Sequence, residues 1–133
     1  MSGGPAPLVS EAPRVYCQCC RTRPQTLAEV IDGQVYTRVA MWDAEERTRV
    51  LHWRWITRAD LATMDTSRVL RCDCCIPEAG RILAEFQDGL LIIWAKRHGR
   101  IHFVALSRTT LERVLAGAGQ EAYASAQLPL SAP

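Results

Sequence analysis

The sequence "CQCC" at residues 17–20 recurs as "CDCC" at residues 72–75, and the two clusters hold all six cysteines of this 133-residue chain. In a reducing compartment, cysteines gathered in this way favour metal binding over disulfides. Two thiolates separated by two residues can face one ion from a tight turn, at about 2.3 Å for zinc. The clusters therefore predict a structural zinc protein.

The segments that follow the two clusters also match each other. "LAEVIDG" at 27–33 corresponds to "LAEFQDG" at 83–89, and "RVLHW" at 49–53 corresponds to "RIHF" at 100–103. Chance does not readily supply such a series in a constant order, so we interpret it as an internal duplication.

Each copy predicts the same local structure. The Asp-Gly pair is typical of a tight hairpin turn, because glycine accepts a positive φ. A return strand follows, containing Trp42 in one copy and Trp94 in the other, and a third strand carries His52 or His102. Each half should thus be a cysteine knuckle followed by a three-stranded meander.

A short helix is expected to close each half, beginning at an N-cap residue, Thr57 or Ser107. The stretch from Ser107 carries Leu111, Val114 and Leu115 on one stripe, and Gly117 is a plausible C-cap.

The fold class predicted is mainly β (α+β), with two duplicated units related by a pseudo-two-fold axis and stapled by zinc. The units are expected at residues 14–66 and 67–116. Small residues and proline predominate outside them, so flexible arms are predicted at 1–13 and 117–133.

A closed structural zinc site needs four ligands, and neither half supplies four obvious ones. The preferred arrangement is one zinc shared between the halves and held by Cys17, Cys20, Cys72 and Cys75.

Other ligand sets remain open. Cys19 and Cys74 create a competing C-x-C register, and they are alternatively small core residues. A rival arrangement gives each half its own metal, using its own cysteines together with His52 or His102. The equivalent positions of the two histidines support it, although a histidine in a strand is more often structural.

The second half, "RVLRCDCCIPEAGRILAEFQDGLLIIWAKRHGRIHF", resembles the small Com-like zinc fingers of bacteriophages. That resemblance implies metal-dependent binding of mRNA and a regulatory role. It departs from the family where "WAKR" stands in place of a second cysteine pair. The matching positions are Arg71, Cys72, Cys75, residues 83–86 and residues 90–93.

Composition constrains function only loosely. The net charge is +2, and all but one of the 16 basic residues are arginine. Arginine suits phosphate binding, and a GC-rich genome is an equally good explanation of the bias. The longest apolar run, residues 90–95, is too short to cross a bilayer. We expect a cytoplasmic location in a bacterium or phage-infected host, or a place in a virion.

Two functions are weighed, and both are non-enzymatic because no known catalytic pattern is present. The first is nucleic-acid binding, with arginines on phosphates and a tryptophan available for stacking. The second is a protein-interaction or assembly module, such as a phage virion component or an inhibitor of a host protein, that contacts its partner through the terminal arms. No small-molecule substrate is expected. The candidate partner residues are Arg21, Arg23, Trp53, Trp55, Arg71, Arg97 and Arg100.

Overall fold

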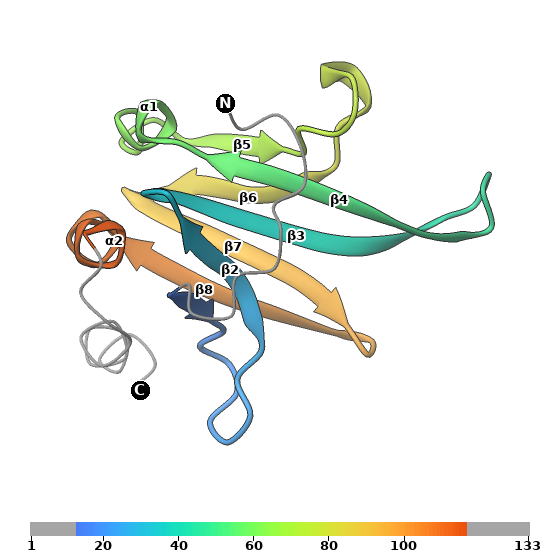
Figure 1. Cartoon of the computed structure of the whole chain (residues 1–133), viewed down its shortest axis with the longest axis horizontal. Helices are drawn as coiled ribbons and strands as arrows, with labels where there is room; N and C mark the ends of the chain where they lie inside the picture. Colours follow the sequence, from blue (N-terminus) through green and yellow to red (C-terminus); the bar gives the residue numbers. More distant parts are fainter. Residues whose placement is uncertain (1–12, 117–133) are drawn as a thin grey trace.

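The computed structural model describes residues 13–116, and it consists of two antiparallel four-stranded sheets with two short α-helices (Figure 1). The mainly β fold class is confirmed. The first half contains β1 (Arg14–Tyr16), β2 (Thr26–Ile31), β3 (Gln34–Asp43), β4 (Thr48–Ile56) and α1 (Arg58–Leu61). The second contains β5 (Arg68–Arg71), the 3-10 turn η1 (Pro77–Ala79), β6 (Ile82–Gln87), β7 (Leu90–Arg97), β8 (Arg100–Ser107) and α2 (Arg108–Leu115).

The strands in each sheet follow chain order, β1-β2-β3-β4 and β5-β6-β7-β8. The predicted three-stranded meanders are present, and each sheet gains a fourth strand that precedes its cysteines. These extra strands, β1 and β5, have three and four residues, too few for a recognisable alternation. Their central residues Val15 and Leu70 are nevertheless completely buried.

The tight turns follow from the Asp-Gly pairs. Asp32 and Gly33 have φ values of 52° and 73°, and Asp88 and Gly89 have 53° and 76°. Two consecutive positive φ values define the turn whose twist matches that of paired strands. Residues 98–99, His-Gly, form a third turn of this kind, between β7 and β8.

The β3–β4 and β7–β8 hairpins differ in length. Trp42 and Trp94 are therefore not equivalent residues of the two copies, although the sequence order suggests that they are. Val39 lies opposite His52, and Ala95 lies opposite His102, so Val39 and Ala95 are equivalent. Trp42 therefore lies beyond the histidine position, whereas Trp94 lies before it. The β3–β4 hairpin extends as an arm that its counterpart lacks (Figure 1).

The two sheets share one hydrophobic core. β2 contacts β7 and β8, and β3 contacts β6, so the sheets pack face to face. Residues buried in this core come from both, including Val35, Ile56, Leu91 and Leu106. Burial of such side chains stabilises each by about 1.5–3 kcal/mol relative to exposure.

Both helices begin where predicted. The Thr57 side chain accepts a hydrogen bond from the Asp60 backbone N–H, and the Ser107 side chain accepts one from Thr110. Leu111 and Val114 of α2 are buried, as its apolar stripe indicated. The predicted C-cap Gly117 and both predicted arms, apart from Pro13, lie outside the described residues.

Candidate metal centres

All six cysteines and two of the three histidines meet in two separate clusters. The Cys17 site comprises Cys17, Cys19, Cys20 and His102. The Cys72 site comprises His52, Cys72, Cys74 and Cys75. Within each site the ligand atoms all lie within 4.8 Å of one another, so each could hold one metal ion.

The distances within the two sites fit a tetrahedral ion. Zinc bonds of about 2.3 Å to sulfur and 2.0–2.1 Å to nitrogen set neighbouring ligand atoms roughly 3.5–3.8 Å apart. In the Cys17 site, His102 Nδ1 lies 3.5 and 3.4 Å from the sulfurs of Cys19 and Cys20.

The Cys72 site has the same dimensions. His52 Nδ1 lies 3.3 Å from Cys74 Sγ and 3.7 Å from Cys75 Sγ, and the two sulfurs are 3.9 Å apart. Three thiols and one imidazole form a Cys₃His set, which is a ligand set of structural zinc sites.

Each site joins the two halves of the chain. The first knuckle, residues 17–20, follows β1 and docks on β8, where Gln18 N–H donates to the Phe103 carbonyl at 2.8 Å. The second knuckle, residues 72–75, follows β5 and docks on β4, where Asp73 N–H donates to the Trp53 carbonyl at 2.7 Å. The edge strand of each sheet is thus capped by the knuckle of the other half.

Side chains reinforce this docking in the same way at both seams. Gln18 Oε1 accepts a hydrogen bond of 2.6 Å from the Ala105 backbone N–H. Asp73 Oδ2 accepts one of 2.9 Å from the Trp55 backbone N–H. The residue after the first cysteine of each knuckle therefore continues the strand pairing and fixes the cysteines beside the histidine.

The structure differs from the single shared site expected for Cys17, Cys20, Cys72 and Cys75. The two pairs belong to different clusters, because the knuckles dock at two different seams. It also differs from the rival arrangement, since each histidine joins the cysteines of the opposite half.

Strand order explains why a half cannot complete its own site. The first knuckle follows β1, and His52 lies on β4, at the opposite edge of the same sheet. Three inter-strand spacings of about 4.8 Å separate these edges by roughly 14 Å. The histidine of the other sheet is the one within reach.

Cys17 and Cys72, the first cysteines of the two knuckles, have lowered pKa values. Burial raises the pKa of Cys17. A hydrogen bond from the Gln25 backbone N–H and hydrogen bonds with the neighbouring thiols outweigh this effect, so the pKa lies below its usual value. The Gln25 nitrogen is 3.1 Å from the sulfur. Cys72 has a lowered pKa for the same reasons, and here the Arg81 backbone N–H donates to the Cys72 sulfur at 3.2 Å.

Cys20, Cys74 and Cys75 have raised pKa values, so they resist ionisation while no cation is near. Burial, together with the adjacent Cys17, raises the pKa of Cys20 to about 11. The hydrogen bond with Cys72 and burial raise that of Cys75 to about 11. One thiolate thus opposes the formation of the next, and a divalent cation is the group that relieves this repulsion.

Both cluster histidines are buried, and His52 is suited to act as a neutral ligand. His52 and His102 are each only 6% exposed. Burial, followed by the charge of Arg81, lowers the pKa of His52, while Asp43 opposes the shift. A neutral imidazole has the free lone pair that a metal ion requires.

The predicted partner residues differ in their exposure and contacts. Arg21, Arg23 and Arg100 are exposed. Arg71 donates from its guanidinium to the Gly80 carbonyl at 2.9 Å. Trp55 is buried and packs on Tyr36, with ring centroids 4.7 Å apart, so it is not available for stacking.

Sequence reasoning placed Cys19, Cys74 and the histidines only among the alternates. The structure brings all of them into the clusters. The signal that could have assigned them was the equivalence of the histidines, combined with the presence of just three cysteines in each half.

Within residues 13–116, none of the helices has the length and apolarity that a membrane crossing requires.

Comparison of the chain with protein-family models, with curated proteins and with solved structures found no match.

Proposed function

We propose that this chain is a zinc-stabilised, non-catalytic recognition protein whose partner is nucleic acid. The observation that carries the zinc assignment is the pair of Cys₃His clusters with tetrahedral spacing. A site with four protein ligands is closed, whereas catalytic zinc keeps an open position for water or substrate. The sites therefore favour a structural role, and they commit every cysteine of the chain.

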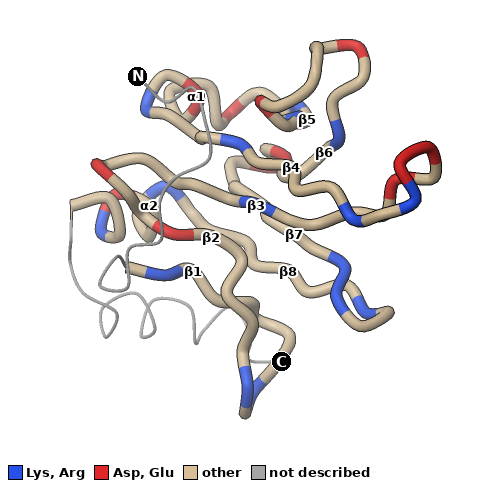
Figure 2. Tube along the Cα trace, turned by 45° about the vertical axis from the view of Figure 1, so that its right-hand side comes forward, with Lys and Arg blue, Asp and Glu red and all other residues tan. Residues whose placement is uncertain are grey.

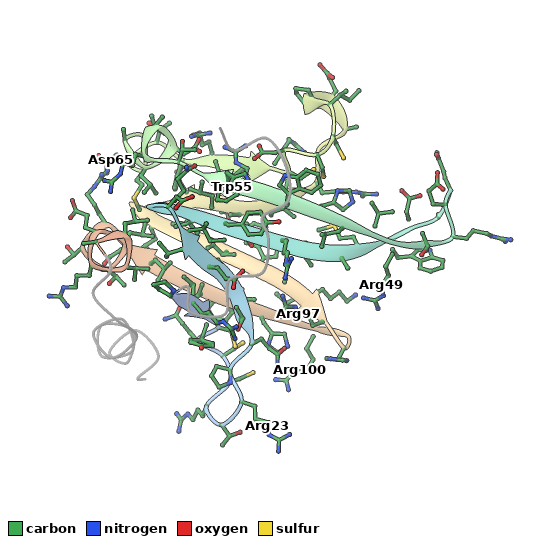
Figure 3. All side chains as sticks on the ribbon, viewed as in Figure 1. Arg23, Arg49, Trp55, Asp65, Arg97 and Arg100 are labelled. Atoms are coloured by element: carbon green, nitrogen blue, oxygen red, sulfur yellow. The ribbon has the colours of Figure 1, made fainter. Side chains whose placement is uncertain are left out.

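The distribution of basic residues favours nucleic acid as the partner. Figure 2 shows Lys and Arg at the β7–β8 turn and in the loop after β1. In Figure 3, Arg49, Arg97, Arg100 and Arg23 follow one another along the same side of the molecule. A polyanion gains from such a row even when the net charge is only +2, since local charge governs attraction.

The knuckles weaken the alternative of a protein partner added to a sheet edge. Strand addition needs unpaired backbone groups along an edge. On β4 and β8, the knuckles already occupy the carbonyls of Trp53 and Phe103. A protein partner remains the second outcome that the experiment has to distinguish.

The test is native mass spectrometry of the full chain with and without chelator, followed by binding titrations over a range of salt concentrations. We expect two zinc ions per chain, and we expect affinity for nucleic acid that falls steeply with salt. Absence of zinc, or salt-insensitive co-purification with a single polypeptide and no affinity for nucleic acid, would contradict the proposal.

A further inference from the structure

A groove runs between the outer part of β3 and the β7–β8 turn. Its larger cavity, of about 450 Å³, is lined by Trp42 and Arg49 of the β3–β4 arm and by Lys96 and His98 of the facing hairpin. β2 pairs with β3 only as far as Thr37, so the flank of β3 beyond that point is not covered by β2.

A second cavity continues this groove toward β1. Its volume is about 250 Å³, and Arg14, Tyr36, Arg38 and Arg97 are among its lining residues. Arg97 also lines a cavity of about 380 Å³ together with Arg49 and Lys96, which both line the larger cavity. One arginine therefore lies between the two cavities, and the groove has room for more than one nucleotide unit along its length.

The larger cavity of the groove carries positive charge without a compensating carboxylate. No carboxylate lines the larger cavity, and the single one in the smaller, Glu29, lies 4.0 Å from Arg14. Among the described residues, Arg49, Lys96 and Arg97 form no ion pair.

Arg97 also lies directly opposite Arg100 in the β7–β8 ladder. Like charges in that position destabilise a hairpin, so folding alone does not account for them.

Two further groups in the groove have, among residues 13–116, no partner that packing explains: the exposed ring of Trp42 and the hydroxyl of Tyr36, whose ring packs on Trp55. Trp42 is 63% exposed, beyond the core and opposite Arg49 in the ladder. The Tyr36 side chain is 1% exposed, and within the described part of the chain its hydroxyl has no hydrogen-bond partner. An exposed tryptophan offers a stacking face for a base, and an unpaired hydroxyl offers a donor for a phosphate or sugar oxygen.

We infer that this groove binds single-stranded nucleic acid, with a base stacked on Trp42 and phosphates held by Arg49, Lys96 and Arg97. The inference rests on the proposed nucleic-acid function and adds its site and the form of its ligand. Stacking needs an unpaired base, and the cavity beside Trp42 has the size of a small-ligand site rather than the width of a duplex.

The experiment measures fluorescence anisotropy of labelled single strands of about 12 nucleotides, within the range of known site sizes. DNA, RNA and duplex versions are titrated with the zinc-loaded full chain. We expect Trp42→Ala to weaken single-strand binding by about 5- to 150-fold without changing the salt dependence. Lys96→Ala should lower the slope of log affinity against log salt by about 0.7.

Tyr36→Phe removes only the hydroxyl and should weaken binding by about 2- to 10-fold. Arg113→Ala is the matched control, because it removes one exposed charge on α2, away from the hairpin turns (Figure 1). Its affinity and salt slope should equal those of the wild type. Zinc content and thermal melting confirm that each variant is folded.

The outcomes separate this inference from the proposed function. If the wild type binds single strands and the groove variants bind equally well, the groove is not the site and the function stands. Tighter binding of the duplex overturns the single-strand assignment alone. If the wild type binds no nucleic acid, both the groove and the proposed function are wrong.

Discussion

His102 Nδ1 lies 3.4 Å from Cys20 Sγ, although 82 positions separate the two residues in the chain. The equivalent contact of the other site, His52 Nδ1 to Cys75 Sγ at 3.7 Å, spans only 23 positions. Both join a knuckle of one half to the edge strand of the other. The two halves are therefore interlocked twice, and an ion at either site would connect both sheets.

Substitution of one histidine should remove one ion and leave the other. We expect His102→Ala to lower the zinc content from two per chain to one, and His52→Ala to do the same, because a closed site that loses a ligand binds zinc much more weakly. Native mass spectrometry gives the count. His98→Ala, at the exposed β7–β8 turn, is the control and should retain two ions. Loss of both ions from either single variant would show that the sites are not independent.

Chelation should separate the halves and unfold the chain. Structural zinc contributes about 10–16 kcal/mol of apparent binding free energy in small domains, which matches or exceeds the usual net stability of about 5–15 kcal/mol. Circular dichroism during titration with a chelator should show loss of β structure, which recovers when zinc is added. Retention of native melting behaviour after complete zinc removal would show that the shared hydrophobic core suffices.

The sequence predicted the strands of the two meanders, their Asp-Gly turns and the helix N-caps, because local chemistry determines them. Asp32-Gly33 and the Thr57 cap need only their neighbours. The strand and the histidine that each knuckle contacts could not be predicted in this way. The histidine that lies beside Cys20 depends on the order of strands in a sheet and on how the two sheets pack. Neither property can be recognised from the residues of a single segment.

The groove has no signal in the sequence for a related reason. Sequence order pairs Trp42 with Trp94, and only the ladder register shows that Trp42 belongs to an arm without a counterpart in the other half. Lys96 and Arg49 lie far apart in the chain and meet through tertiary structure.

The docking side chains Gln18 and Asp73 should each contribute to stability. Asp73→Ala removes the acceptor for the Trp55 N–H, and Gln18→Ala removes that for the Ala105 N–H. An unsatisfied donor costs about 1–3 kcal/mol, so we expect losses of that size in the free energy of unfolding, measured with denaturant. Asp73→Asn keeps an acceptor oxygen and serves as the matched control. Equal losses in the Asn and Ala variants would mean that charge, rather than the hydrogen bond, holds the knuckle.

Asp60 should make stability depend on pH at the acid end. Its Oδ1 lies 3.0 Å from Arg54 on β4 and 2.9 Å from Arg68 on β5, and its Oδ2 accepts from the Thr57 N–H at 3.0 Å. Burial raises the pKa of Asp60. The hydrogen bond from the Thr57 N–H and the charges of both arginines outweigh this effect, so the pKa lies below its usual value. A lowered folded-state pKa gives stability that is fully present above the unfolded value of about 3.9 and is lost as pH falls through the folded one.

We therefore expect Asp60→Asn to be less stable than the wild type by about 1–3 kcal/mol at neutral pH, since the partly exposed Arg54 and Arg68 both lose this counter-charge. The difference should shrink toward zero as the pH falls below the folded pKa, because the wild-type carboxyl is then neutral too. Denaturant unfolding at a series of pH values provides the measurement. Asp65→Asn is the control: its side chain is 89% exposed and 4.0 Å from Arg108, so the change should stay within about 0.5 kcal/mol. A pH-independent difference for Asp60→Asn would show that the side chain acts as a helix cap alone, without a charge contribution from Arg54 and Arg68.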